Sequence, residues 1–169
     1  MKKLPHQLTE NVKVLQKAVL AYDGRCLVLK RSDDSKSRPG KWDLPGGNVE
    51  WPSTKSDLKN PHLEELLREI VEETGIIINE DSAESCYVGT YYKADQDMFT
   101  VILGWKVELG QIPEVKISSE HTEYAWMALA EGPNYDFGFA GEKGQFIRSM
   151  IDNSLGQGCG CGGCGGACG

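Results

Sequence analysis

The chain of 169 residues has no long apolar run. Its first residues begin MKKLPHQLTE, and they lack the unbroken apolar stretch of about 7 to 15 residues that a signal peptide requires. No segment approaches the roughly 18 apolar residues of a membrane-spanning helix. These absences predict a cytoplasmic protein that does not associate with membranes.

Cysteine is scarce outside the C-terminal end, since only Cys26 and Cys86 precede residue 156. Two thiols so far apart do not indicate a disulfide framework. The other four cysteines, Cys159, Cys161, Cys164 and Cys168, share an uncharged, glycine-rich tail with a spacing unlike that of common zinc folds. We therefore predict one domain over residues 1–155 and a flexible, disordered Gly/Cys-rich tail over 156–169, with no role in catalysis.

Positive charge is also in short supply. The 18 lysines and arginines are outnumbered by 25 aspartates and glutamates, which gives a formal net charge of −7. Such a chain lacks the field that attracts long nucleic acids. A small phosphate-bearing partner is still compatible with this charge, provided that a metal ion or local basic residues neutralise it.

The order of expected elements indicates an α/β domain. Val- and Leu-rich runs predict strands near 13–21 and 25–31, joined at Asp23-Gly24 by a type I′ turn. Tryptophan and leucine alternate in WDL (42–44), which predicts a short strand that stops at Pro45-Gly46-Gly47. Residues 32–41 and 51–60 are expected to be loops, and further strands are expected at 87–94, 98–109 and 123–129.

Two helices are expected. The first covers about 61–74, with Asn60 as its cap and Gly75 at its end. Its apolar stripe comprises Leu63, Leu66, Leu67, Ile70 and Val71. The second covers 142–155 and turns Phe146, Ile147, Met150 and Ile151 to one side. Strands flanked by two helices predict a single domain in which a mixed β-sheet is packed between helices.

Three carboxylates of the first helix, Glu69, Glu72 and Glu73, are spaced i, i+3 and i+4. Like charges at this spacing destabilise an isolated helix by roughly a few tenths of a kcal/mol per pair. A hard divalent cation such as Mg²⁺ or Mn²⁺ among them would explain the arrangement. The alternative is a solvated helix face on which Arg68 offsets Glu64 and Glu72.

The segment Gly46-Gly47, a loop, and then REIVEETGI at 68–76 resembles the signature of the Nudix hydrolases. The second half of that signature matches at every fixed position, and KWDLPGGNVE is typical of the residues before it. The resemblance covers most of residues 12–152 and implies the Nudix fold.

One part departs from the pattern. Twenty residues separate Gly47 from Arg68, seven more than in the family, so Ser53 or Asn60 falls where the family carries its first glutamate. Asp57 is a possible substitute. We expect weakened rather than abolished chemistry, and a catalytically silent, nucleotide-binding module is the alternative.

The resemblance implies hydrolysis of a nucleoside diphosphate linked to another group, with a nucleoside triphosphate as first choice. A dinucleoside polyphosphate or a nucleotide sugar is the alternative substrate. The implied ligands of Mg²⁺ or Mn²⁺ are Glu69, Glu72, Glu73 and the carbonyl of Gly46, and the metal lowers the pKa of a bound water. Arg68 is implied to brace these glutamates rather than to contact substrate.

Several other residues are candidates for the site. Glu120, or as second choice Glu123, is expected to act as base or extra ligand, and His121 is either a proton carrier or structural. Arg31 is a candidate for binding phosphate. Tyr91 and Tyr92 are candidates for stacking on a base and fall where some dinucleoside polyphosphate hydrolases carry a tyrosine, although strand aromatics are more often core. The expected partner is a small nucleotide, and a homodimer is left open.

Overall fold

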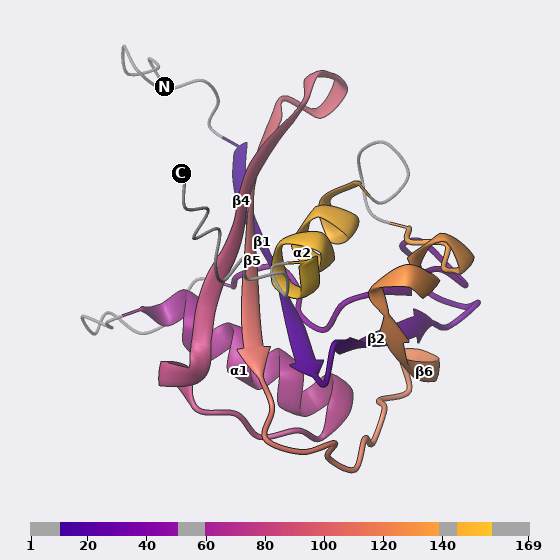
Figure 1. The fold of residues 1–169 in the computed structure, drawn as a ribbon. Coiled ribbons are helices and arrows are strands. Elements are labelled where there is room, and N and C mark those ends of the chain that lie inside the picture. Colours follow the sequence, from indigo (N-terminus) through magenta and orange to yellow (C-terminus); the bar gives the residue numbers. More distant parts are fainter. Residues whose placement is uncertain (1–10, 51–59, 139–144, 157–169) are drawn as a thin grey trace, which may run out of the picture.

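The computed structural model describes residues 11–50, 60–138 and 145–156 (Figure 1). Within these ranges the strands are β1 (Asn11–Tyr22), β2 (Arg25–Arg31), β3 (Trp42–Asp43), β4 (Ala83–Lys93), β5 (Met98–Glu108) and β6 (His121–Ala128). The α-helices are α1 (Pro61–Thr74) and α2 (Gln145–Leu155), and the short 3₁₀ helices are η1 (Glu80–Ser82), η2 (Ala94–Gln96) and η3 (Leu129–Asn134).

The strands form one mixed sheet in the order β3-β2-β1-β5-β4, with β6 paired to β2. The long strands β1, β5 and β4 stand side by side (Figure 1). Strand β1 pairs with β5 in parallel, for example Ala18 with Trp105, whereas β4 pairs with β5 antiparallel. The predicted mixed sheet is confirmed.

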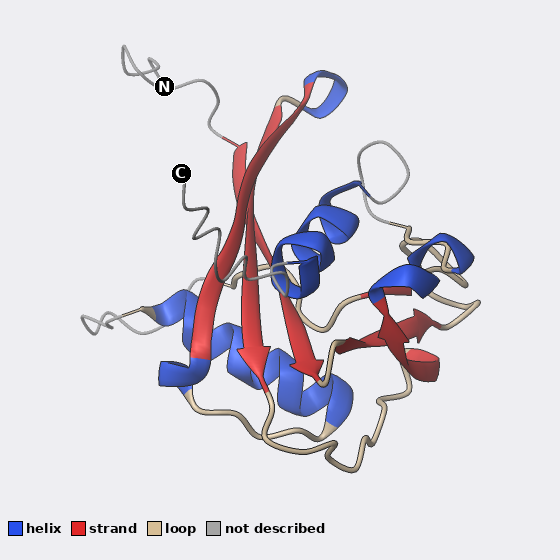
Figure 2. Ribbon diagram, viewed as in Figure 1, coloured by secondary structure: helices blue, strands red, loops and turns tan. Residues whose placement is uncertain are grey.

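The sheet lies between α1 and α2 (Figure 2). Along β1, Val19 packs in the cluster that contains α2, while its neighbours Ala18 and Leu20 pack in the cluster that contains α1. Successive strand residues point to opposite faces. The apolar runs of β1 and β2 are therefore continuous because both faces of these strands are covered.

The turn between β1 and β2 has the predicted backbone. Asp23 and Gly24 have positive φ angles of 47° and 72°, as a type I′ turn requires. Cys26, in β2, is buried, and both it and Cys86 are free thiols, as the sequence indicated.

Helix α1 has the predicted bounds, but its start differs in detail. Asn60 has a left-handed backbone (φ 53°) and its side chain does not cap the helix; its amide instead donates to Glu80 Oε1 at 3.3 Å. Gly75 ends the helix at φ 71° and donates its N–H to the Val71 carbonyl. Val71 itself is 42% exposed, so the predicted apolar stripe is one residue too wide.

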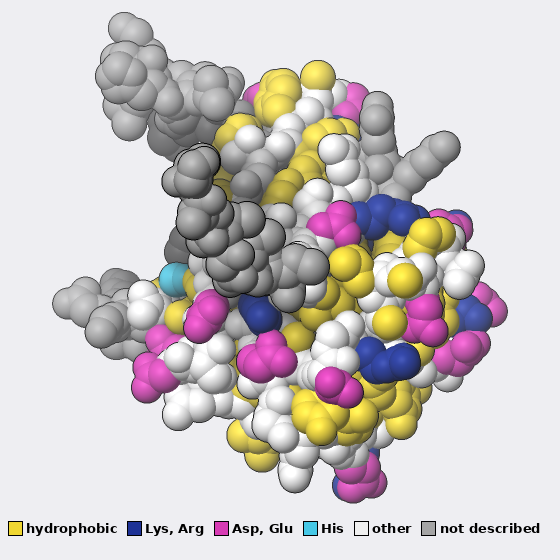
Figure 3. All heavy atoms as spheres, viewed as in Figure 1, with side chains coloured by type: hydrophobic (Ala, Val, Ile, Leu, Met, Phe, Trp, Pro, Cys, Tyr) yellow, Lys and Arg dark blue, Asp and Glu magenta, His cyan; other side chains and the backbone are white. Residues whose placement is uncertain are grey.

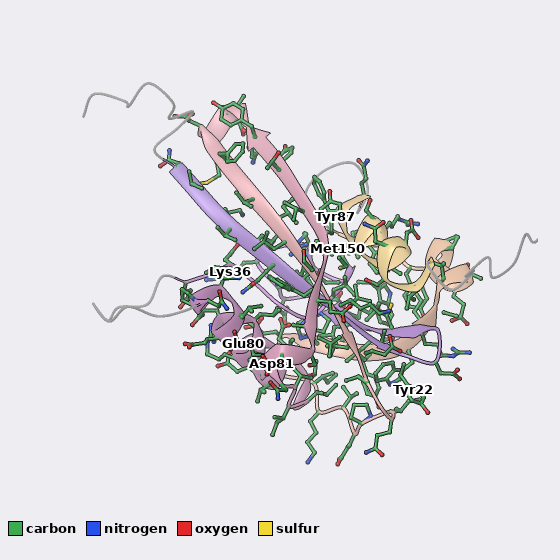
Figure 4. The ribbon with its side chains drawn as sticks, turned by 60° about the vertical axis from the view of Figure 1, so that its left-hand side comes forward. Tyr22, Lys36, Glu80, Asp81, Tyr87 and Met150 are labelled. Carbon is green, nitrogen blue, oxygen red and sulfur yellow. The ribbon has the colours of Figure 1, made fainter. Side chains whose placement is uncertain are left out.

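Helix α2 packs against the sheet at Gly104 in β5, where it brings Met150 close to the strand. A Cβ atom there would lie 2.8 Å from both Met150 Cγ and Tyr87 Cβ. Figure 4 shows these two labelled side chains close together, Tyr87 on β4 and Met150 on α2. The absence of a side chain at Gly104 is what allows the helix to approach the sheet at this point.

The surface carries charges of both signs. On the face shown in Figure 3, acidic and basic side chains lie among apolar ones. In the described part of the chain, no helix is long and apolar enough to cross a bilayer. Three predicted parts lie wholly or partly outside the described residues. They are the loop 51–60 as far as residue 59, the first three residues of the helix 142–155, and the Gly/Cys tail from residue 157 onward.

Candidate functional site

A cleft of about 530 Å³ opens beside β1, the loop after β3 and helix α1. Both signs of charge line it. Its carboxylates are Glu50, Glu69, Glu73 and Glu120, and its cations are Lys13, Lys17, Arg31, Arg38 and Lys93. A cleft with this lining suits a polyanion whose charge is shared between basic side chains and carboxylate-bound cations.

The loop after β3 is held flat on β1. Three backbone hydrogen bonds connect them, from Gln16 N–H to the Gly47 carbonyl, from Ala18 N–H to the Pro45 carbonyl and from Val49 N–H to the Val14 carbonyl. Gly46 has a φ of 116°, and a Cβ there would lie 2.6 Å from the Gln16 carbonyl oxygen. Glycine at this position therefore lets the loop lie directly on the strand.

Glu73 joins helix α1 to this loop. It is only 7% exposed, and its Oε2 accepts the Gly46 N–H at 2.7 Å. Burial raises the pKa of Glu73 to about 7, although the nearby Lys17 charge and the bond from Gly46 act in the opposite direction. Glu73 is thus a carboxyl group poised to titrate near neutral pH at the wall of the cleft.

Lys17 lies in the interior of β1 with 2% of its surface exposed. Its ammonium donates to Asp43 Oδ2 at 3.0 Å, to the Leu44 carbonyl at 2.9 Å and to the Gly46 carbonyl at 2.6 Å. Asp43 Oδ2 also lies 3.1 Å from Arg38 Nη2. These contacts form a buried charge network directly beneath the loop.

Arg68 organises the acidic face of α1. Its guanidinium donates to Glu65 at 2.8 Å, to Glu69 at 2.8 Å and to Glu72 at 2.7 Å. Glu65, three residues before Arg68, therefore takes the place in which the sequence suggested Glu64.

The three glutamates predicted as a cluster lie in different surroundings. Glu69 lines the cleft, and burial is the largest cause of its raised pKa. Glu73 points inward, whereas the side chain of Glu72 is 57% exposed and does not line the cleft. In the described ranges, no group of three or more acidic, histidine or cysteine side chains is arranged to hold a metal ion.

His121, at the start of β6, is buried beside Glu73. Its Nε2 lies 3.9 Å from Glu73 Oε1, and its Nδ1 lies 3.3 Å from Ser118 Oγ. Burial lowers the pKa of His121 to about 4, and the charges of Lys17 and Arg31 act in the same direction. A neutral, buried imidazole fits the structural alternative better than the proton carrier.

The two carboxylates considered as base are separated by the structure. Glu120 lines the cleft, whereas Glu123, whose side chain is 56% exposed, forms an ion pair with Lys30 at 2.7 Å at the protein surface. Tyr91 also lines the cleft, but Tyr92 donates instead to Asp97 at the tip of the β4–β5 hairpin.

Sequence reasoning missed Lys17, Asp43 and Gln96, which lines the cleft from η2. A signal for the first was present, because a lysine within the apolar run LQKAVL must either leave the core or find partners inside it. Asp43 lies in the predicted short strand WDL and in the segment KWDLPGGNVE, and neither pattern gave it a role of its own. Nothing in the sequence indicated Gln96, because its position depends on how the β4–β5 hairpin folds back.

The comparisons with known proteins agree with this architecture. The sequence profile described as the NUDIX domain matches residues 15–150. A curated relative from Escherichia coli (strain UMN026), the nucleoside triphosphatase NudI, is 29% identical over 136 residues, which cover 76% of this chain and 91% of the relative.

Solved structures match as well. The MutT protein of Methanosarcina mazei Go1 superimposes with a TM-score of 0.62 at 26% identity, covering 84% of this chain and 91% of that chain. A MutT NUDIX hydrolase from Burkholderia pseudomallei superimposes with a TM-score of 0.61 over 85% of this chain and 98% of that chain; its identity of 24% supports the fold alone.

Proposed function

Because the chain belongs to the Nudix hydrolase family and is an enzyme of its pyrophosphohydrolase type, we propose that it hydrolyses a nucleoside triphosphate with the help of Mg²⁺ or Mn²⁺. The observation that carries the proposal is the cleft, in which Glu69 and Glu73 from α1 meet Glu120 and several basic side chains. The named activity of the Escherichia coli relative supports the choice of substrate class.

The donor set suits a hard divalent ion. Carboxylate oxygens are the ligands that Mg²⁺ prefers, and Glu69 and Glu73 present them at one wall of the cleft. Glu50 lines the same space and is available to complete the ligand set. Glu72 stays an expected ligand, but its hydrogen bond with Arg68 would have to break before it could bind a metal ion. When bound, the metal neutralises phosphate oxygens and acidifies a water molecule.

The chain's own residues orient this chemistry. Arg68 fixes Glu69 by a direct hydrogen bond at 2.8 Å, and Gly46 fixes Glu73 through its N–H. Glu120 is the proposed base and accepts a proton from the attacking water. The oxygen of that water forms a bond to phosphorus as the P–O bond of the anhydride breaks, and the leaving phosphate keeps the electron pair.

Basic side chains of the cleft are proposed to bind the rest of the polyphosphate. Arg31 and Lys93 line it from β2 and β4. Tyr91 offers a ring face to a base, and the Gln96 amide offers both a donor and an acceptor to the base edge.

The test is a panel of nucleoside triphosphates assayed for released phosphate or pyrophosphate, with and without Mg²⁺. We expect metal-dependent turnover by the wild type and a loss of at least about 100-fold in Glu69→Gln. Glu64→Gln is the matched control, since Glu64 lies on the same helix but is exposed. Equal turnover by Glu69→Gln would contradict the proposal. Tight nucleotide binding in calorimetry without turnover by the wild type would favour the silent module.

A further inference from the structure

Lys17 is an unusual residue for its location. It lies in the middle of a strand that is buried on both faces, between Gln16 and Ala18, which are 1% and 0% exposed. An isolated ammonium in such a place would cost many kcal/mol, so it must be paired and hydrogen-bonded. The three donors of Lys17 are all used, each on a different oxygen.

These oxygens form a small cage. It is defined by the carboxylate of Asp43 and the carbonyls of Leu44 and Gly46, which converge on one point from one short segment of chain. One carboxylate with two carbonyls is a donor set that a hard cation also takes. The Lys17 ammonium fills this cage, at 2.6 to 3.0 Å from the three oxygens.

The cage adjoins the cleft through a single residue. Gly46 accepts from Lys17 with its carbonyl oxygen and donates its N–H to Glu73. Lys17, Gly46 and Glu73 also all line the cleft. A cation in the cage therefore sits one residue away from a carboxylate of the site proposed above.

We propose that the Lys17 ammonium occupies a position which a divalent ion would otherwise take. The Gly46 carbonyl accepts a hydrogen bond from Lys17 instead of binding a metal ion. Divalent ions then bind only at the carboxylates that line the cleft. This inference rests on the proposed metal dependence of the site. It revises the sequence-based expectation that the Gly46 carbonyl is a metal ligand. Lys17 is a positioning residue, because it holds the loop and contacts no reacting atom.

Replacing Lys17 by methionine removes the charge and leaves a side chain that is one heavy atom shorter, so that no atom takes the place of Nζ. The buried Asp43 carboxylate would keep two cationic neighbours, since Arg38 Nη2 lies 3.1 Å and Arg31 Nη1 lies 3.8 Å from its Oδ2. The emptied cage would then present its oxygens to a free cation. Lys17→Gln serves as a second neutral variant, whose amide can still donate to a carbonyl.

The test is a Mn²⁺ titration of the full chain, with free Mn²⁺ measured by electron paramagnetic resonance. We expect Lys17→Met and Lys17→Gln to bind one Mn²⁺ more than the wild type, and to gain more thermal stability from added Mn²⁺. Lys13→Met is the matched control, since Lys13 also lies on β1 and lines the cleft, and it should keep the wild-type number.

The inference would be overturned if the wild type and both Lys17 variants bound the same number of Mn²⁺ ions per chain. A gain of one equivalent supports it whether or not the wild type hydrolyses nucleotides. Failure of the nucleotide assay in a wild type that binds no Mn²⁺ would instead count against the proposed function, so the two failures are distinguishable.

Discussion

Glu73 Oε2 accepts the backbone N–H of Gly46 at 2.7 Å, and this hydrogen bond ties the last turn of α1 to the loop that lies on β1. The glycine loop follows β3 directly, and Gly46 and Glu73 are 27 residues apart in the chain. Their relative placement decides where Glu69 points, because Glu69 Oε2 would lie only 3.1 Å from a Cβ at Gly47. The bond between Glu73 and Gly46 is thus part of what defines the site.

Removing this bond should destabilise the fold. Glu73→Ala leaves the buried Gly46 N–H without an acceptor, and we expect a loss of about 1–3 kcal/mol in the free energy of unfolding measured in urea. Glu73→Gln keeps an acceptor and should lose less. Glu72→Ala is the control and should change stability by no more than about 0.5 kcal/mol, because Glu72 is exposed. Equal stability of Glu73→Ala and Glu72→Ala would show that the bond contributes nothing.

The buried pair Glu73 and His121 should give opposite pH dependences. The pKa of Glu73 is raised from 4.5 to about 7, so the folded state binds more protons than the unfolded state in this window, and the free energy of unfolding falls as pH rises. The pKa of His121 is lowered from 6.5 to about 4, so its contribution rises with pH between these values. The wild type should therefore have a nearly flat stability profile between about pH 4.5 and 6.5.

Replacing either residue of the pair should reveal the pH dependence that the other gives to the free energy of unfolding. Urea unfolding with a chelator present should show stability falling with pH in His121→Gln and rising in Glu73→Gln, each by at most roughly 1.4 kcal/mol per pH unit. Profiles of the same slope in both variants would refute this assignment of the two titrations.

Glu120 and Glu123 should differ sharply in kinetics. Glu120 lines the cleft, and Glu120→Gln should lower kcat by about 10²–10⁴ if it takes the proton of the attacking water. Glu123→Gln breaks only an exposed ion pair with Lys30 and should leave kcat within about twofold. A large loss of kcat in Glu123→Gln with none in Glu120→Gln would reverse the roles.

Local patterns predicted much of the fold because they act over short stretches of chain. The start and end of α1 follow from Pro61 and Gly75, and the first hairpin follows from Asp23-Gly24. The parallel pairing of β1 with β5 could not be predicted in the same way. It joins residues 87 positions apart, as in Leu20 with Val107, and depends on how both helices cover the sheet.

The candidate site was predicted in its residue types but not in its geometry. Helical spacing places Glu69, Glu72 and Glu73 near one another, but it does not say which carboxylate turns toward the sheet. The loop at Gly46 and the guanidinium of Arg68 decide this, by holding Glu73 inward and Glu72 outward. The partners of Lys17 could not be predicted, because its three acceptor oxygens are brought to β1 only by the folded loop.

The packing of α2 on the sheet can be tested at Gly104. A methyl group there would meet Met150 Cγ and Tyr87 Cβ at 2.8 Å and Cys86 Sγ at 3.2 Å, so Gly104→Ala should lower the free energy of unfolding by about 1–3 kcal/mol. Gly110→Ala is the control, because a Cβ at Gly110 meets no atom within 4 Å and should change stability by less than about 0.5 kcal/mol. Met150→Ala removes one of the clashing groups, so the double variant should be more stable than the sum of the two single losses predicts. Strict additivity would mean that the strain lies against β4 rather than against the helix.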